Sequence, residues 1–234
     1  MSGLRDRVLE ALGTVYDPEL DEPITGLRFL SSLRVEPDGD VEVLLRLPTP
    51  QCAPNFAFLM AADARAAVGR LPGVRDVRVV LQDHYTGEEI NRALARGEGF
   101  MGAFPGETED DDLEELRSLF TRKALIARQT IVCERLLAQG RTVDQLAALT
   151  LDGLPDSPEA RRCLELRERL GIGSGPGAAA FVQADGEAVS SQDMPRWLRM
   201  GRLVRTSLEA NGGICRSLLQ FRHDLAADPE EVGR

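Results

Sequence analysis

The sequence predicts an α+β protein, in which a small α-β-β-α-β unit with a small sheet precedes a mostly α-helical C-terminal domain. Three observations support this prediction. Two alternating strand patterns flank an Asp38-Gly39 turn, an apolar helix pattern follows them, and helical periodicity dominates the rest of the chain. We therefore expect a first domain over residues 1–97, a linker over 98–112, and a helical domain over 113–234.

The first domain begins with a helical pattern over residues 3–15, where apolar side chains recur at helical spacing. Asp17-Pro18 ends this helix, because the residue before a proline is pushed out of the α region. Strands are predicted over residues 27–35 and 41–47, joined by the Asp-Gly pair as a tight hairpin.

The first domain continues with a helix over residues 56–71, which Pro72-Gly73 ends. A third strand follows over 74–81, and a short helix over 86–96. Glycines are frequent between residues 97 and 106, and the acidic run over 107–112 follows them directly. This composition is typical of a linker.

The C-terminal domain is predicted to contain several helices and one small hairpin. A glycine-containing triplet, Asn211-Gly212-Gly213, is expected to separate the last two helices, which would place Cys215 at the start of the final helix. The helices are expected over residues 113–139, 142–149, 157–170, 195–210 and 214–226, with the hairpin over 180–189.

Composition excludes several classes of protein. The 234-residue chain has a net charge of −10 that is spread over both halves, so neither half provides a basic nucleic-acid surface. No apolar run is long enough for a membrane span, and the first residues lack the apolar core of a signal peptide. We expect a cytosolic protein whose four cysteines are reduced, and the absence of a C-x-x-C pair argues against a zinc knuckle or a thioredoxin-type motif.

Cys52 is the residue whose position most directly indicates chemistry. It lies in the turn Thr49-Pro50-Gln51-Cys52, between a predicted strand and a predicted helix. A thiol at the start of a helix lies near partial positive charge, which favours negative charge on the sulfur. Thiolates bind soft metals and iron–sulfur clusters. The sequence therefore allows three roles for Cys52: a ligand, a nucleophile, or a small packed side chain.

Three motifs of the first domain together resemble a known family. They are Asp17-Pro18-Glu19, the Thr49–Cys52 turn, and Leu71-Pro72-Gly73-Val74 before the third strand. In this order they resemble the metal–sulfur cluster biosynthesis family, which includes PaaD-like and SufT-like proteins, over residues 4–82. Two departures are Ala53, which separates the cysteine from Pro54, and the altered entry to the first strand at residues 25–29.

The resemblance implies a fold like the one expected above and a role in maturing iron–sulfur or related iron proteins. It also implies that Cys52 is the functional thiol and that Asp17 and Thr49 lie close to it. Asp17 could orient Thr49 or a bound metal, or it could be only an acidic residue of the turn. Glu19 could likewise be functional or be only a structural acid. Thr49 could donate its hydroxyl to the sulfur or simply cap its turn.

Two further residues are candidate metal ligands. His84 follows the third strand and is expected at the same edge of the sheet as Cys52, although a loop histidine is more often only a surface residue. Cys215 would share the helix-start setting of Cys52. Cys133 and Cys163 fall within helical patterns, where burial is the simpler explanation.

We consider three functions. The first is a non-enzymatic assembly factor that transiently holds iron or an iron–sulfur cluster at Cys52 and serves a client apo-protein together with the assembly machinery. The client would be an iron–sulfur enzyme or, from a resemblance to long family forms, a di-iron monooxygenase. One thiolate fills few coordination positions, so a homodimer or a transfer complex is expected. The alternatives are an interaction scaffold and a cysteine-nucleophile enzyme with His84 or His223 as its base.

Overall fold

The computed structural model describes residues 3–106 and 113–223, and it divides the chain into two compact units. One unit comprises Met1–Glu114 together with Asn211–Arg234, and the other comprises Glu115–Ala210. The first unit combines helices with small sheets, and the second is mostly helical, which confirms the predicted α+β class. Within the described residues, no helix is both long and apolar enough to span a membrane.

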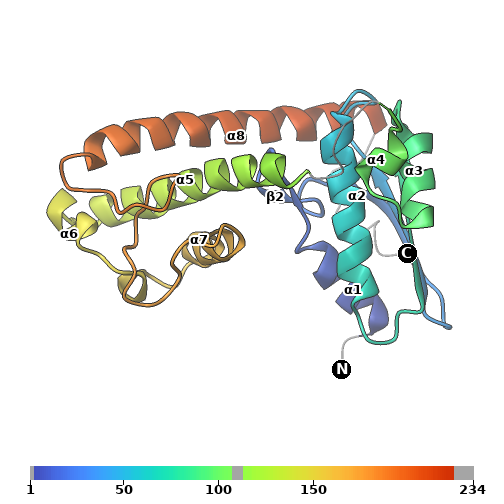
Figure 1. The fold of residues 1–234 in the computed structure, drawn as a ribbon, viewed down its shortest axis with the longest axis horizontal. Helices are drawn as coiled ribbons and strands as arrows, with labels where there is room; N and C mark the ends of the chain where they lie inside the picture. Colours follow the sequence, from blue (N-terminus) through green and yellow to red (C-terminus); the bar gives the residue numbers. More distant parts are fainter. Residues whose placement is uncertain (1–2, 107–112, 224–234) are drawn as a thin grey trace. The chain divides into compact units, whose positions relative to one another are not determined.

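The first unit is built around a three-stranded sheet with the order β3-β4-β5. The helices of this unit are labelled in Figure 1. β3 and β4 pair antiparallel, as the predicted hairpin requires, and β4 and β5 pair parallel. Parallel neighbours need a crossover connection, which α2 provides. The elements of this unit are α1 (Leu4–Leu12), β1 (Tyr16–Asp17), β2 (Glu22–Pro23), β3 (Leu30–Val35), β4 (Asp40–Arg46), α2 (Pro54–Gly69), β5 (Asp76–Gln82), α3 (Gly87–Arg96) and α4 (Phe100–Ala103).

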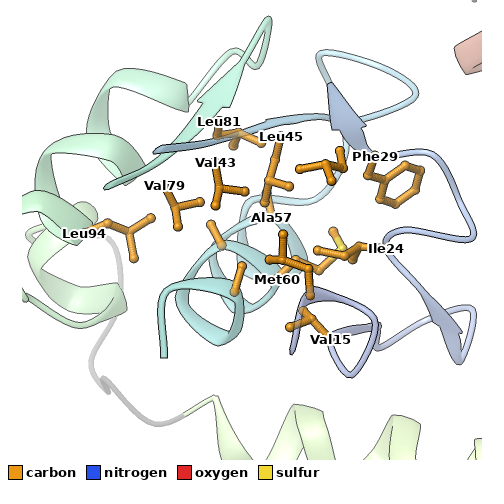
Figure 2. Close-up of a cluster of buried hydrophobic side chains, with 14 of the residues drawn as sticks. Val15, Ile24, Phe29, Val43, Leu45, Ala57, Met60, Val79, Leu81 and Leu94 are labelled. Atoms are coloured by element: carbon orange, nitrogen blue, oxygen red, sulfur yellow. The ribbon is translucent and has the colours of Figure 1, made fainter. Parts of the chain in front are cut away.

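The core of the first unit lies between the sheet and α2 (Figure 2). Alternate residues of β4 are buried, as the strand period of two requires, so Val43 and Leu45 face the helix that carries Ala57 and Met60. α1 packs on α2, and α3 packs on β5. This layer fixes the loops that leave the ends of β4 and β5.

The segment between α1 and β3 differs from the prediction. The predicted strand over 27–35 begins only at Leu30, because Arg28 has a φ of 63° and lies in the left-handed region. The preceding residues form a two-stranded ladder, in which Asp17 of β1 pairs with Glu22 of β2. Sequence periodicity could not reveal these strands, since each is only two residues long.

The stretch with linker-like composition is partly folded. Residues 100–103 form α4, and the Phe100 ring packs edge-on against Phe58 at 5.5 Å between centroids. Phe104 is buried in the same core. The glycines of this stretch therefore permit turns around a short helix that aromatic burial holds in place. Residues 107–112 of the predicted linker lie outside the described residues.

The second unit has its own core, formed by α5, α7, the first part of α8 and a small loop region. The predicted hairpin is present as a bridge between Val182 and Ala188, with Gly186 at a φ of 94° in the turn. Gln129 of α5 fixes the peptide of Val182 by donating to its carbonyl oxygen and accepting from its N–H. The helices are α5 (Glu114–Ala138), α6 (Val143–Ala147), a 3-10 turn (Leu151–Gly153), α7 (Pro158–Arg169) and α8 (Met194–His223).

The predicted interruption of the last helix is wrong. α8 continues from Met194 to His223 through Asn211, Gly212 and Gly213 (Figure 1). A glycine inside a helix costs only about 1 kcal/mol relative to alanine, which packing can offset. A glycine is favoured at position 212 for a steric reason, because a Cβ there would lie 2.8 Å from Oε1 of Glu22. The residues beyond Ala210 belong to the first unit rather than to a separate helical domain.

Candidate functional site

The candidate site lies where the parallel strands β4 and β5 end. Carboxyl ends of parallel neighbours meet at the same edge of a sheet, so the loop after β4 meets the loop after β5. The first loop carries Thr49 and Cys52, and the second carries His84. The Tyr85 N–H donates to the carbonyl oxygen of Pro50 at 3.1 Å, which joins the two loops directly. The predicted proximity of His84 to the cysteine turn is therefore confirmed.

The Cys52 turn presents its thiol just before α2. The backbone N–H of Cys52 donates to the carbonyl oxygen of Thr49, and the side chains also meet, with 3.5 Å between Thr49 Oγ1 and Cys52 Sγ. Both side chains are partly exposed. α2 starts with Pro54, which suits the first helical position, and Ala53 provides no side-chain cap. A partly exposed sulfur thus lies beside a hydroxyl group, near the positive end of the helix dipole.

His84 contacts the backbone of the Cys52 turn. Its Nε2 lies 2.7 Å from the Cys52 carbonyl oxygen, while its Nδ1 accepts from the Thr86 N–H at 3.3 Å. Burial lowers the pKa of His84, although the hydrogen bond to Cys52 opposes this effect. The neutral imidazole with its proton on Nε2 satisfies both contacts. Both ring nitrogens are therefore used in holding the loops together, which is a positioning role and leaves neither nitrogen open to a metal ion in this conformation.

Asp17 is a buried carboxyl group in the β1 ladder. Its Oδ1 accepts from the backbone N–H groups of Glu19 and Leu20, at 2.8 and 3.0 Å. Burial raises the pKa of Asp17 to about 6, against the effect of these two hydrogen bonds. Asp17 thus caps the turn that follows β1, which was one of its two predicted roles.

Cys215 lies in the interior of α8, so its predicted position at a helix start is wrong. The structure nevertheless brings it to the first domain. The thiol is partly buried against the same hydrophobic core as Cys52. Burial raises the pKa of Cys215 to about 11, and the negative charges of Asp17, Cys52 and Glu19 raise it further. Cys215 therefore lies within electrostatic range of Cys52, although 163 positions separate them in the sequence.

The last turns of α8 contact the rest of the first unit, and the sequence analysis did not predict these contacts. Arg216 forms an ion pair with Glu22, Leu219 is 1% exposed, and Arg222 donates to the Pro48 carbonyl oxygen at 2.9 Å. Cys215, Leu219 and Arg222 follow the i, i+4, i+7 spacing of one helix face. This spacing could have revealed the contact face if the glycine pair had not suggested a break.

The other two cysteines are structural. Cys133 and Cys163 are 0% and 2% exposed, which confirms their predicted burial. Burial raises the pKa of Cys133 to about 12, and its sulfur lies 3.9 Å from the sulfur of Met194. Neither thiol is accessible to a metal or a reagent in the folded chain.

No group of three or more histidine, cysteine, aspartate or glutamate residues within the described ranges is arranged to hold a metal ion. At the ends of β4 and β5 the site therefore provides the Cys52 thiol and the Thr49 hydroxyl group rather than a complete coordination shell. Iron–sulfur clusters generally use four protein ligands.

Comparison with known proteins places the site in a family context. Residues 5–81 match the family model of the iron–sulfur cluster assembly protein. An uncharacterized protein of Methanocaldococcus jannaschii is 33% identical over 94 residues, which are 40% of this chain and 97% of that protein. An iron–sulfur cluster carrier protein of Mycobacterium tuberculosis is 32% identical over 162 residues, which are 66% of this chain.

A second carrier protein, from Deinococcus radiodurans, is 39% identical over 77 residues, which are 32% of this chain and 21% of that protein. The chain also spans only 39% of the length of the mycobacterial carrier protein. The matched segment of the family model contains Asp17, Thr49 and Cys52 and ends before His84.

Proposed function

Because the chain belongs to the iron–sulfur cluster assembly protein family through residues 5–81, we propose that it carries iron or an iron–sulfur cluster at Cys52 and transfers it to a client protein. The iron or cluster is cargo in this role, and the protein is an assembly factor rather than an enzyme. The names of the carrier relatives support the same role.

The observation that carries the proposal is the setting of the Cys52 thiol. The sulfur is partly exposed, lies 3.5 Å from the Thr49 hydroxyl group, and stands before the N-terminus of α2. The sulfur is therefore accessible to iron, and a hydroxyl donor and a helix N-terminus stabilise the negative charge of an iron-bound sulfur. An accessible sulfur also allows the cargo to leave, because a client thiolate must approach the iron during transfer.

The incomplete ligand set supports a transfer role as well. A carrier needs to hold its cargo less tightly than the client does, and a site with few protein ligands meets this requirement. The remaining positions on iron would be filled by a second copy of the chain, by a small thiol, or by the assembly machinery and then the client. The client is an enzyme that needs iron; an iron–sulfur enzyme and a di-iron monooxygenase are the two candidates.

The cysteine-nucleophile alternative has less support. A nucleophilic cysteine needs a base within hydrogen-bond reach, and His84 directs its ring nitrogens to the Cys52 carbonyl and to Thr86. The hydrogen-bond partner of the Cys52 sulfur is the Thr49 hydroxyl group, which is not a base at neutral pH.

Anaerobic reconstitution with ferrous iron and sulfide tests the proposal. We expect the wild-type chain to retain iron and sulfide through gel filtration and Cys52→Ser to retain neither. Cys133→Ala is the matched control, because it removes a buried thiol far from any accessible surface. Equal retention by wild type and Cys52→Ser would contradict the carrier role and favour the interaction scaffold.

A further inference from the structure

The C-terminal end of α8 forms part of the first unit. It contacts the loop that contains Cys52. Arg222 donates to the carbonyl oxygen of Pro48, which lies in the loop that contains Cys52. Two turns earlier on the same helix face lies Cys215, and Leu219 between them is buried in the core. The face of α8 that carries Cys215 is thus the face that contacts the Cys52 loop.

A second anchor fixes the position of Cys215. Arg216, the next residue, forms an ion pair with Glu22, and Gly212 provides the space that this carboxylate occupies. Glu22 pairs with Asp17 across the short β1–β2 ladder. The charge of Asp17 in turn acts on the Cys215 thiol. Arg216 and Arg222 lie within two turns of Cys215, so their contacts place this part of α8 against the β1–β2 ladder and the loop that contains Cys52.

The two sulfur atoms have matching properties. Cys52 and Cys215 are both unpaired in the structure, both partly exposed, and both packed against the core of the first unit. The thiols of Cys133 and Cys163 are instead buried in the core of the second unit. A negative charge on Cys52 also acts on Cys215.

We propose that Cys52 and Cys215 form a thiol pair that binds iron or an iron–sulfur cluster through both sulfur atoms. This inference rests on the proposed function, since it takes Cys52 as an iron ligand and adds a second one. Two sulfur ligands from one chain fill two positions on the metal, which makes the site a chelate. On binding, each thiol loses its proton to solvent as its sulfur–iron bond forms, and no oxidation or reduction is needed.

The thiol pair gives the end of α8 a definite role. The family match ends at residue 81, so Cys215 lies outside the matched segment. The helix end would hold the cargo more tightly than Cys52 could alone.

Reconstitution of Cys215→Ala with ferrous iron and sulfide tests the thiol pair. Alanine is the best helix former, so this variant keeps α8 intact, and circular dichroism checks the fold. We expect Cys215→Ala to lose most of the iron that the wild type retains through gel filtration. The matched control is the double variant Cys215→Ala with Leu218→Cys, in which the new thiol lies on the exposed side of α8. This variant has as many thiols as the wild type, and we expect that it does not recover iron binding.

Titration with cobaltous ion gives a second readout that does not depend on cluster assembly. We expect the thiolate-to-cobalt charge-transfer absorbance of the wild type to fall to half in either single variant and to vanish in Cys52→Ser with Cys215→Ala. Equal absorbance and equal iron retention in wild type and Cys215→Ala would overturn the thiol pair. If Cys52→Ser alone lost iron, the proposed carrier function would stand; if neither variant lost iron, both proposals would fail.

Discussion

The Nε2 atom of His84 lies 2.7 Å from the carbonyl oxygen of Cys52, so the loop after β5 holds the loop that presents the thiol. The contact is made to the backbone, and the sulfur itself remains beside Thr49. His84 therefore contacts the backbone of the Cys52 turn rather than its sulfur.

The variant His84→Ala should loosen the Cys52 turn. It removes the hydrogen bond to Cys52 and the one that Thr86 donates, and a typical hydrogen bond contributes about 1 kcal/mol. We expect the free energy of unfolding to fall by about 1–2 kcal/mol, and retention of reconstituted iron to fall as well. Urea denaturation and iron analysis measure the two effects.

The matched variant His84→Gln keeps a side-chain donor that can reach the carbonyl oxygen of Cys52. It should recover part of the stability and of the iron retention. If His84→Ala retained iron as the wild type does, the loop contact would have no part in presenting the thiol.

We expect the free energy of unfolding of the first unit to fall as the pH rises from 4 to 6, because the buried Asp17 carboxyl group loses its proton over this range. Its pKa is raised from 3.8 to about 6 by burial, so the folded state binds this proton more tightly than the unfolded state does. Its contribution to stability is fully present below pH 3.8 and is lost as pH rises through about 6. At about 1.4 kcal/mol per pKa unit, the loss approaches about 3 kcal/mol.

Asp17→Asn keeps an oxygen that accepts from the N–H groups of Glu19 and Leu20 but carries no charge. We expect it to be more stable than the wild type at pH 7.5 and to show no such gain at pH 4. Urea denaturation of both proteins at the two pH values measures this. A lower stability of Asp17→Asn at pH 7.5 would show that the carboxylate is favourable where it lies.

Two adjacent glycines of α8 should respond differently to alanine. A Cβ at Gly213 meets no atom within 4 Å, so Gly213→Ala should stabilise the helix by about 0.5–1 kcal/mol. A Cβ at Gly212 would lie 2.8 Å from Glu22 Oε1. Gly212→Ala should therefore displace this carboxylate, weaken its pair with Arg216, and lower iron retention.

Thermal unfolding and iron analysis of the two glycine variants provide the comparison. If Gly212→Ala and Gly213→Ala stabilised the protein equally and retained equal iron, the contact between Glu22 and α8 would not position the site.

The four thiols should react with iodoacetamide in a fixed order. Cys52 and Cys215 are partly exposed, whereas Cys133 and Cys163 are buried. Burial raises the pKa of Cys215 to about 11, so we expect Cys215 to react more slowly than Cys52 at pH 8. Mass spectrometry of tryptic peptides measures each rate. Reaction of Cys133 at the rate of Cys52 in the folded protein would contradict the assigned burial.

Much of the first domain could be predicted from the sequence because its signals are local. The Asp-Gly turn with Gly39 at a φ of 94°, the strand alternation and Pro54 at the start of α2 each fix one element. His84 was expected near the Cys52 turn because both follow strands of the same sheet, and the parallel pairing of β4 with β5 explains why the two loops meet. These features need no knowledge of distant contacts.

The course of α8 could not be predicted from local signals. Asn211-Gly212-Gly213 has low helix propensity, yet burial of Leu219 and the pairing of Arg216 with Glu22 outweigh it. α4 was missed for a similar reason, because Phe100 and Phe104 stabilise it only through their core contacts. Tertiary packing, which a single sequence does not display, decided both elements.

The most direct measurement of the central claim is transfer of a cluster to an apo-ferredoxin under anaerobic conditions. The reconstituted wild-type chain should restore the ferredoxin spectrum faster than free iron and sulfide at the same concentration do. Cys52→Ser, treated in the same way, should give no more than the rate with free iron and sulfide. Equal transfer by wild type and Cys52→Ser would contradict a carrier function at Cys52.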